Sequence, residues 1–87
     1  MIVVHMPTAG AIYRPNEDEM GIELMAICRG LGLEVLDVGS GIRALGLTDA
    51  QLEEAWLRPG GCGHYSPKGN DLVAEVIRRY LTQPRAR

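Results

Sequence analysis

Two short apolar segments, separated by about the length of one helix, constrain the fold of this chain most. The first is Met1–Pro7, which reads Met-Ile-Val-Val-His-Met-Pro, and the second is Leu33–Val38. Continuous apolar runs of this length are typical of strands that are buried on both faces of a parallel sheet. Pro7 ends the first run because it cannot donate to a sheet ladder.

The residues between these strands predict a loop and then a helix. Thr8–Pro15 reads as the loop, and Asn16 is the expected N-cap, with Glu19 completing a capping box three residues later. A strand, a helix and a second strand in succession predict a right-handed parallel βαβ unit. The apolar stripe expected to face the core consists of Met20, Leu24, Ile27, Cys28 and Leu31.

Two further helices are expected in the second half of the chain. Thr48 is a good N-cap with Gln51 as its capping-box partner. Ser66 is another, and Pro67 fits the first helical position, where no N–H partner is needed. The apolar stripe of this last helix consists of Leu72, Val73, Val76, Ile77, Tyr80 and Leu81.

The expected fold class is therefore α/β, with two parallel strands and about three helices arranged as a βαβ unit followed by helices. At 87 residues we expect one small domain over residues 1–82 and a disordered tail over 83–87. A parallel sheet of two strands leaves an open edge. We expect that edge to be covered by another copy of the chain, by a complementing chain, or by upstream strands absent from this sequence.

The composition limits the classes of function that this chain can have. An apolar content of 46% and a mean hydropathy of -0.03 fit a globular chain. The net charge of -2 argues against nucleic acid as a partner. Neither a membrane span nor a signal peptide is visible, so we expect a cytoplasmic protein. The two cysteines, Cys28 and Cys62, read as thiols of a reducing compartment.

One histidine stands out as a candidate catalytic residue. His64 follows a glycine-rich stretch and lies two residues before Ser66, so the last helix would hold it at a repeatable position. An imidazole near neutral pH can take and return a proton, which makes His64 a candidate general base. His5, at the end of the first strand, and the thiol of Cys62 are weaker candidates. A packed histidine and a loop thiol are the simpler interpretations of these two.

The segment His-Tyr-Ser-Pro-Lys-Gly-Asn-Asp-Leu-Val-Ala-Glu, residues 64–75, resembles the last block of the SGNH (GDSL-type) hydrolases. The resemblance implies that His64 is the base of a Ser-His-Asp triad, that Gly69 is the glycine of the block and that Ala74 is its small helical residue. It implies the C-terminal part of a three-layer, flavodoxin-like fold. The implied activity is hydrolysis of a small-molecule ester or acylated substrate, with neither a metal nor an organic cofactor.

The chain departs from that family in three ways. It has no Gly-Asp-Ser nucleophile motif, and it lacks the blocks that build the oxyanion hole. The acid expected two or three residues before the base is also missing, because those positions hold Cys62 and Gly61. The chain thus carries one triad member of three, and we expect it to be inactive alone.

Two alternatives stand beside the hydrolase. Val-Leu-Asp-Val-Gly-Ser-Gly, residues 35–41, resembles the first motif of S-adenosylmethionine methyltransferases, in which glycines let the backbone approach the cofactor. Arg43 occupies the place of the third glycine of that motif. The other alternative is a non-catalytic α/β interaction module that keeps the histidine loop for structure.

Overall fold

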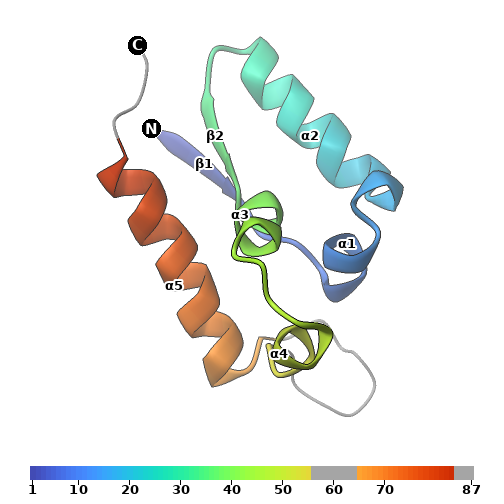
Figure 1. The fold of residues 1–87 in the computed structure, drawn as a ribbon. Coiled ribbons are helices and arrows are strands. Elements are labelled where there is room, and N and C mark those ends of the chain that lie inside the picture. The colour runs from blue at the N-terminus through green and yellow to red at the C-terminus, as the bar shows by residue number, and fades with distance from the viewer. Residues whose placement is uncertain (56–64, 84–87) are drawn as a thin grey trace. The chain divides into compact units, whose positions relative to one another are not determined.

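The computed structural model of the chain describes residues 1–55 and 65–83 (Figure 1). It is a mixed α/β structure with a two-stranded parallel sheet. By its internal contacts the chain divides into two compact units, Met1–Leu47 and Thr48–Arg87, and each is described below by itself. The prediction of a single domain over 1–82 and a disordered tail stays a prediction, and residues 84–87 lie outside the described residues.

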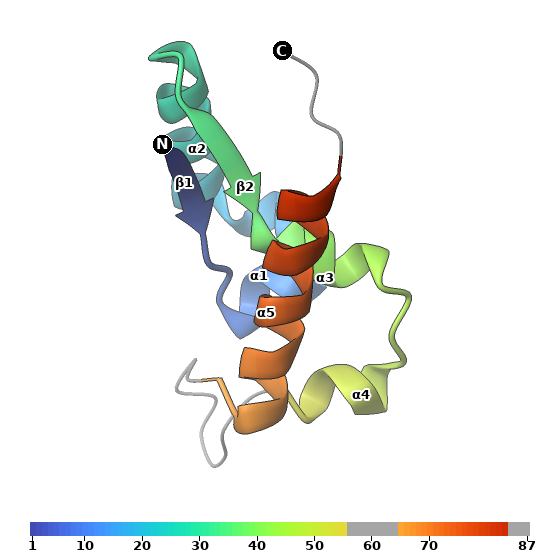
Figure 2. The ribbon, with the colours of Figure 1, turned by 90° about the vertical axis from the view of Figure 1, so that its left-hand side faces the viewer.

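The first unit is built on the predicted βαβ motif. Strand β1 (Ile2–His5) pairs in parallel with β2 (Glu34–Asp37), so that His5 stands beside Asp37 at the end of the sheet. Helix α2 (Glu19–Gly30) makes the crossover, and the two views show it as right-handed (Figures 1 and 2). The expectation that β1 is buried on both faces is wrong, since Val4 is 42% exposed. With one neighbouring strand, β1 lacks the cover that an interior strand receives.

The segment predicted as a loop contains a short helix. Helix α1 (Ala9–Tyr13) begins because the Thr8 hydroxyl accepts a hydrogen bond from the backbone N–H of Ala11, at 3.2 Å. A 3-10 turn, η1 (Pro15–Glu17), follows it. The predicted cap at Asn16 is wrong, because Asn16 lies within this turn. The residue that caps α2 is Asp18, whose carboxylate accepts from Gly21 N at 3.2 Å.

The predicted apolar stripe of α2 is placed wrongly. The residues of α2 that the structure buries are Gly21 and Met25, and Cys28 is half-buried. The other four members of the stripe are at least half exposed: Met20 at 75%, Leu24 at 51%, Ile27 at 52% and Leu31 at 72%. Apolar residues occupy more than one face of this helix, so periodicity alone did not identify the face that packs on the sheet.

A second unexpected helix, α3 (Val38–Ala44), starts directly after β2. The Asp37 carboxylate caps it: Oδ1 accepts from the backbone N–H groups of Gly39, at 3.1 Å, and Ser40, at 3.4 Å. The glycines at 39 and 41 therefore lie inside a helix. With α1 and α3, the described residues form five α-helices rather than about three. Short helices set by one capping side chain are hard to distinguish from turns in a sequence.

The second unit contains two of the predicted helices. Thr48 caps α4 (Asp49–Glu53), and the predicted capping box with Gln51 is confirmed. Ser66 caps α5 (Pro67–Thr82) with Pro67 in its first turn, also as predicted. In the predicted stripe of α5, Val73 and Val76 are buried, whereas Leu81 is 55% exposed.

Helix α5 carries an exposed cluster of charges. Glu75 accepts hydrogen bonds from Arg78 and Arg79 at 2.6 Å, across one helical turn. These two hydrogen bonds lower the pKa of Glu75 to about 2, so its carboxylate stays ionised well below neutral pH. Because the cluster is exposed, salt screens it, and it contributes little to stability.

The capping role of Asp37 generates a prediction. Replacing Asp37 with Ala leaves the first N–H groups of α3 without an acceptor, and we expect this to lower the free energy of unfolding by roughly 1–2 kcal/mol. Urea denaturation followed by circular dichroism measures the loss. Asp49→Ala is the matched control, because Asp49 lies in the first turn of α4 but Thr48 caps that helix. Equal stability of Asp37→Ala and wild type would contradict the capping role.

Candidate functional site

The residue predicted to be catalytic, His64, lies outside the described residues, as does Cys62. The structure does describe the residues on either side of that segment, Ala55 and Tyr65. The part of this candidate site that the structure describes is the anchor that follows His64 in the chain. The anchor consists of Ser66, Lys68 and Gly69. All of these residues belong to the second unit.

Ser66 joins the start of α5 to the end of α4. Its backbone N–H donates to the carbonyl oxygen of Ala55 at 2.9 Å, and its hydroxyl donates to the carbonyl of Glu54. The same hydroxyl oxygen accepts from Gly69 N at 3.1 Å, which is the helix cap. Ser66 is buried, so these bonds do not compete with water. They hold together the two ends of the segment that contains His64.

Lys68 adds an ion pair to the same junction. Its ammonium group lies 2.6 Å from Oε2 of Glu54, with both side chains more than half exposed. An exposed pair contributes at most about 1 kcal/mol. The pair therefore supports the junction that Ser66 makes and does not create it.

Gly69 is the position in the block where only a glycine fits. A Cβ atom built on Gly69 would overlap the backbone carbonyl of Ala55. The missing side chain lets the first turn of α5 pack directly against the backbone at the end of α4. Ser and Gly at these two positions of the block thus have a physical role, which is to close the junction that precedes α5.

Tyr65, the neighbour of His64, is half-buried. Burial raises the pKa of its phenol above the usual value of 10.0. The phenol is therefore neutral at physiological pH, and it offers no base of its own beside His64.

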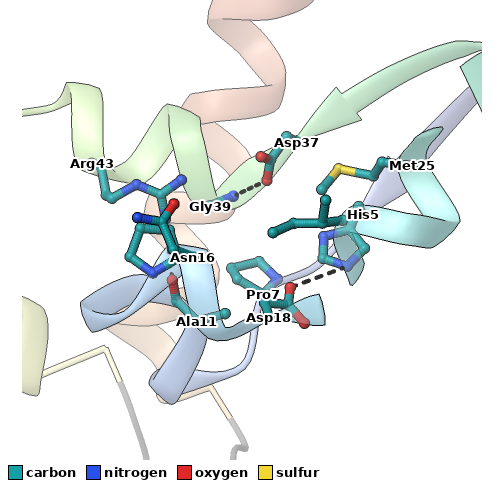
Figure 3. A pocket seen from close by; sticks show the side chains of 11 residues that line it. His5, Pro7, Ala11, Asn16, Asp18, Met25, Asp37, Gly39 and Arg43 are labelled. Atoms are coloured by element: carbon teal, nitrogen blue, oxygen red, sulfur yellow. Dashed lines mark hydrogen bonds and ion pairs between the residues drawn. The ribbon is translucent and has the colours of Figure 1, made fainter. Parts of the chain in front are cut away.

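A second candidate site lies in the first unit, at the carboxyl ends of β1 and β2 (Figure 3). It is a cavity of about 180 Å³, and open α/β sheets bind ligands at this edge. Its polar lining comes from His5, Asn16, Asp18, Asp37 and Arg43. Apolar side chains, among them those of Pro7, Ile22 and Met25, line the rest.

His5 is held in this cavity beside a carboxylate. Its Nε2 lies 3.9 Å from Oδ2 of Asp18, with side chains that are 20% and 27% exposed. Its Nδ1 is buried and has no hydrogen-bond partner. The ring nitrogen of His5 that faces a possible partner is therefore Nε2, towards Asp18. Gly21 makes this approach possible, because a Cβ there would collide with both side chains.

On the other side of the cavity, polar side chains satisfy one another. Nη2 of Arg43 donates to the Ser40 hydroxyl at 3.1 Å, and that hydroxyl donates to Oδ2 of Asp37 at 2.8 Å. Nη1 of Arg43 also donates to the carbonyl oxygen of Ala11, at 3.3 Å, which ties α3 to α1. Asp37 and Arg43 thus shape the cavity as a connected network.

The structure brings His5 and Asp37 together, as expected for the ends of paired strands. Sequence reasoning did not place Asp18 beside His5, because that contact joins a strand to the start of a helix and has no local signal. The cavity can accommodate a small polar molecule between the imidazole and the guanidinium. Within the described residues, no group of three His, Cys, Asp or Glu side chains could hold a metal ion.

Comparison of the chain with protein-family models, with curated proteins and with solved structures gives no match. Among the described helices none is long and apolar enough to span a membrane.

The packing of Gly69 generates a prediction. We expect Gly69→Ala to destabilise the chain by roughly 1–3 kcal/mol, because the new methyl group must displace the Ala55 backbone. Chemical denaturation of the purified chain measures this change.

Gly30→Ala is the matched control. Gly30 is also helical, its φ is not positive, and a Cβ there would meet nothing within 4 Å. This variant should be neutral or stabilising by up to about 1 kcal/mol. Equal changes in the free energy of unfolding for Gly69→Ala and Gly30→Ala would show that Gly69 does not pack closely on Ala55.

Proposed function

We propose that the chain is the base-bearing C-terminal part of an SGNH-type ester or acyl hydrolase, with His64 as the general base. The observation that carries the proposal is the junction made by Ser66 and Gly69. These residues of the His-Tyr-Ser-Pro-Lys-Gly block fasten the start of α5 to the end of α4. A buried cap two residues after His64 in the chain supports the assignment of a catalytic role to that histidine.

The reaction implied by this proposal is acyl transfer to a serine and then to water. A serine hydroxyl attacks the ester carbonyl, the base takes its proton, and the same base returns that proton to the leaving alcohol. His64 is the group in this chain to which we assign the proton transfer. The nucleophile and the acid that orients the base are not supplied by the matching positions of the sequence.

Both serines of the chain are engaged in structural hydrogen bonds. The Ser40 hydroxyl donates to Asp37 and accepts from Arg43, while the Ser66 hydroxyl donates to Glu54 and accepts from Gly69. Within residues 1–55 and 65–83, neither hydroxyl is hydrogen-bonded to an imidazole. In this proposal the nucleophile therefore comes from other polypeptide sequence, and the isolated chain has little activity.

The methyltransferase alternative receives less support. The motif needs a glycine loop between its strand and helix, so that the backbone can approach the cofactor. Here α3 begins at Val38, immediately after β2, and the Asp37 carboxylate is occupied in capping that helix. The alternative of a non-catalytic interaction module is supported by a different observation, the exposed apolar stripe of α2.

An esterase assay with short-chain nitrophenyl esters tests the proposal. We expect the wild-type chain to hydrolyse p-nitrophenyl acetate at least about 10⁴-fold more slowly than a complete triad enzyme, because the nucleophile is missing. The residual rate above buffer should be lost in His64→Ala and kept in His5→Ala, which is the matched control. Turnover that is unchanged in His64→Ala would leave the proposed base without a role.

A further inference from the structure

Helix α2 presents an apolar stripe that no other element of the first unit covers. The stripe consists of Met20, Leu24, Ile27 and Leu31, each more than half exposed. The face of α2 that packs in the first unit is a different one, formed by Gly21 and Met25. Single exposed apolar side chains are ordinary, but an aligned set along one helix face marks an interaction surface.

Strand β1, which neighbours α2, has one edge that pairs with no other described strand. Strand β1 pairs with β2 on one side, and its four residues, Ile-Val-Val-His, include neither Lys nor Pro. The other strand, β2, carries Glu34 and Asp37 at its two ends. Charged residues on an edge strand discourage pairing with another chain, whereas an uncharged apolar edge invites it. Of the two edges, that of β1 is the one suited to pairing.

The stripe and the free edge of β1 lie on the same side of the first unit. Residues of a helix advance by about 100° each, which places the stripe about a third of a turn before the face marked by Gly21 and Met25. The crossover from β1 through α2 to β2 is right-handed (Figures 1 and 2). With this handedness, a face about a third of a turn before the packed one points away from β2 and past β1. Strand edge and helix stripe therefore form one continuous surface.

This surface is complementary to itself. The stripe residues are separated by four, three and four positions, a spacing that reads the same in both directions. Against an antiparallel copy of α2, Met20 meets Leu31 of the partner subunit and Leu24 meets Ile27 of the partner subunit. The same two-fold axis brings the β1 edges together as antiparallel strands. An interface made from one patch on both subunits is the usual form of a homodimer.

We infer that the occupant of this surface is a second copy of the chain. The dimer extends the sheet to four strands in the order β2-β1-β1-β2 and packs the two α2 helices side by side on one face. A copy is favoured over an unrelated partner because every stripe residue finds an apolar counterpart in the copy. The inference does not depend on the proposed hydrolase function, since it uses no residue of the His64 block.

The test is the association state of the full chain and of two variants with equal charge. Leu24→Glu places a carboxylate in the stripe, at a residue already 51% exposed. Ala26→Glu places the same charge on the same helix at an exposed residue outside the stripe. Sedimentation equilibrium at micromolar concentrations should give twice the 9.5 kDa chain mass for wild type and Ala26→Glu. In Leu24→Glu the dimer dissociation constant should rise by at least about tenfold, because the dimer buries two unpaired carboxylates.

A double variant tests the register. Leu24→Glu combined with Ile27→Lys would set a carboxylate opposite an ammonium group at both copies of the contact, so it should recover part of the lost affinity. Circular dichroism confirms that each variant keeps its helical content, and Ile27→Glu replaces Leu24→Glu if the latter does not fold. A monomeric wild type, or equal weakening by Leu24→Glu and Ala26→Glu, overturns the dimer. A double variant no tighter than Leu24→Glu overturns the antiparallel register.

Discussion

The parallel pairing of β1 with β2 is the constraint on which the first unit depends. Two parallel strands require a crossover, and α2 supplies it. The pairing brings His5 and Asp37 to the same edge, where the chain then turns into α1 and α3. The cavity there exists because both strands end together and the capping groups of the following helices line it. Its polar groups thus serve two purposes, since Asp37 and Asp18 cap helices and also face the cavity.

In the second unit, the corresponding constraint is the junction between α4 and α5. Ser66 satisfies a backbone carbonyl of α4 and a backbone N–H of α5 with one hydroxyl. Gly69 removes the side chain that would separate the two helices. The junction pairs Ser66 with Ala55, the last described residue before residues 56–64. Ser66 and Gly69 therefore have a structural role of their own, which does not depend on the resemblance of their block to a family.

Local signals in the sequence identified two of the helix starts. The caps at Thr48 and Ser66 were predicted correctly, because a capping side chain and its partner lie within three residues of one another. The same kind of signal was present at Asp37 but was interpreted as part of a glycine loop. The outward orientation of Met20 and Leu24 was not predictable, since it depends on which apolar face of α2 meets the sheet. The contact of His5 with Asp18 is likewise a product of how strand and helix pack.

We propose that His64, which precedes the Ser66 and Gly69 junction in the chain, acts as an accessible base, while His5 is held in the first unit. Carbethoxylation with diethyl pyrocarbonate, followed by absorbance at the wavelength of the modified imidazole, distinguishes the two histidines of the chain. The account predicts a fast phase that disappears in His64→Ala and persists in His5→Ala, and a slower phase from His5, whose Nδ1 is buried. A fast phase that survives in His64→Ala, or a His64 that reacts only after the chain is unfolded, would contradict it.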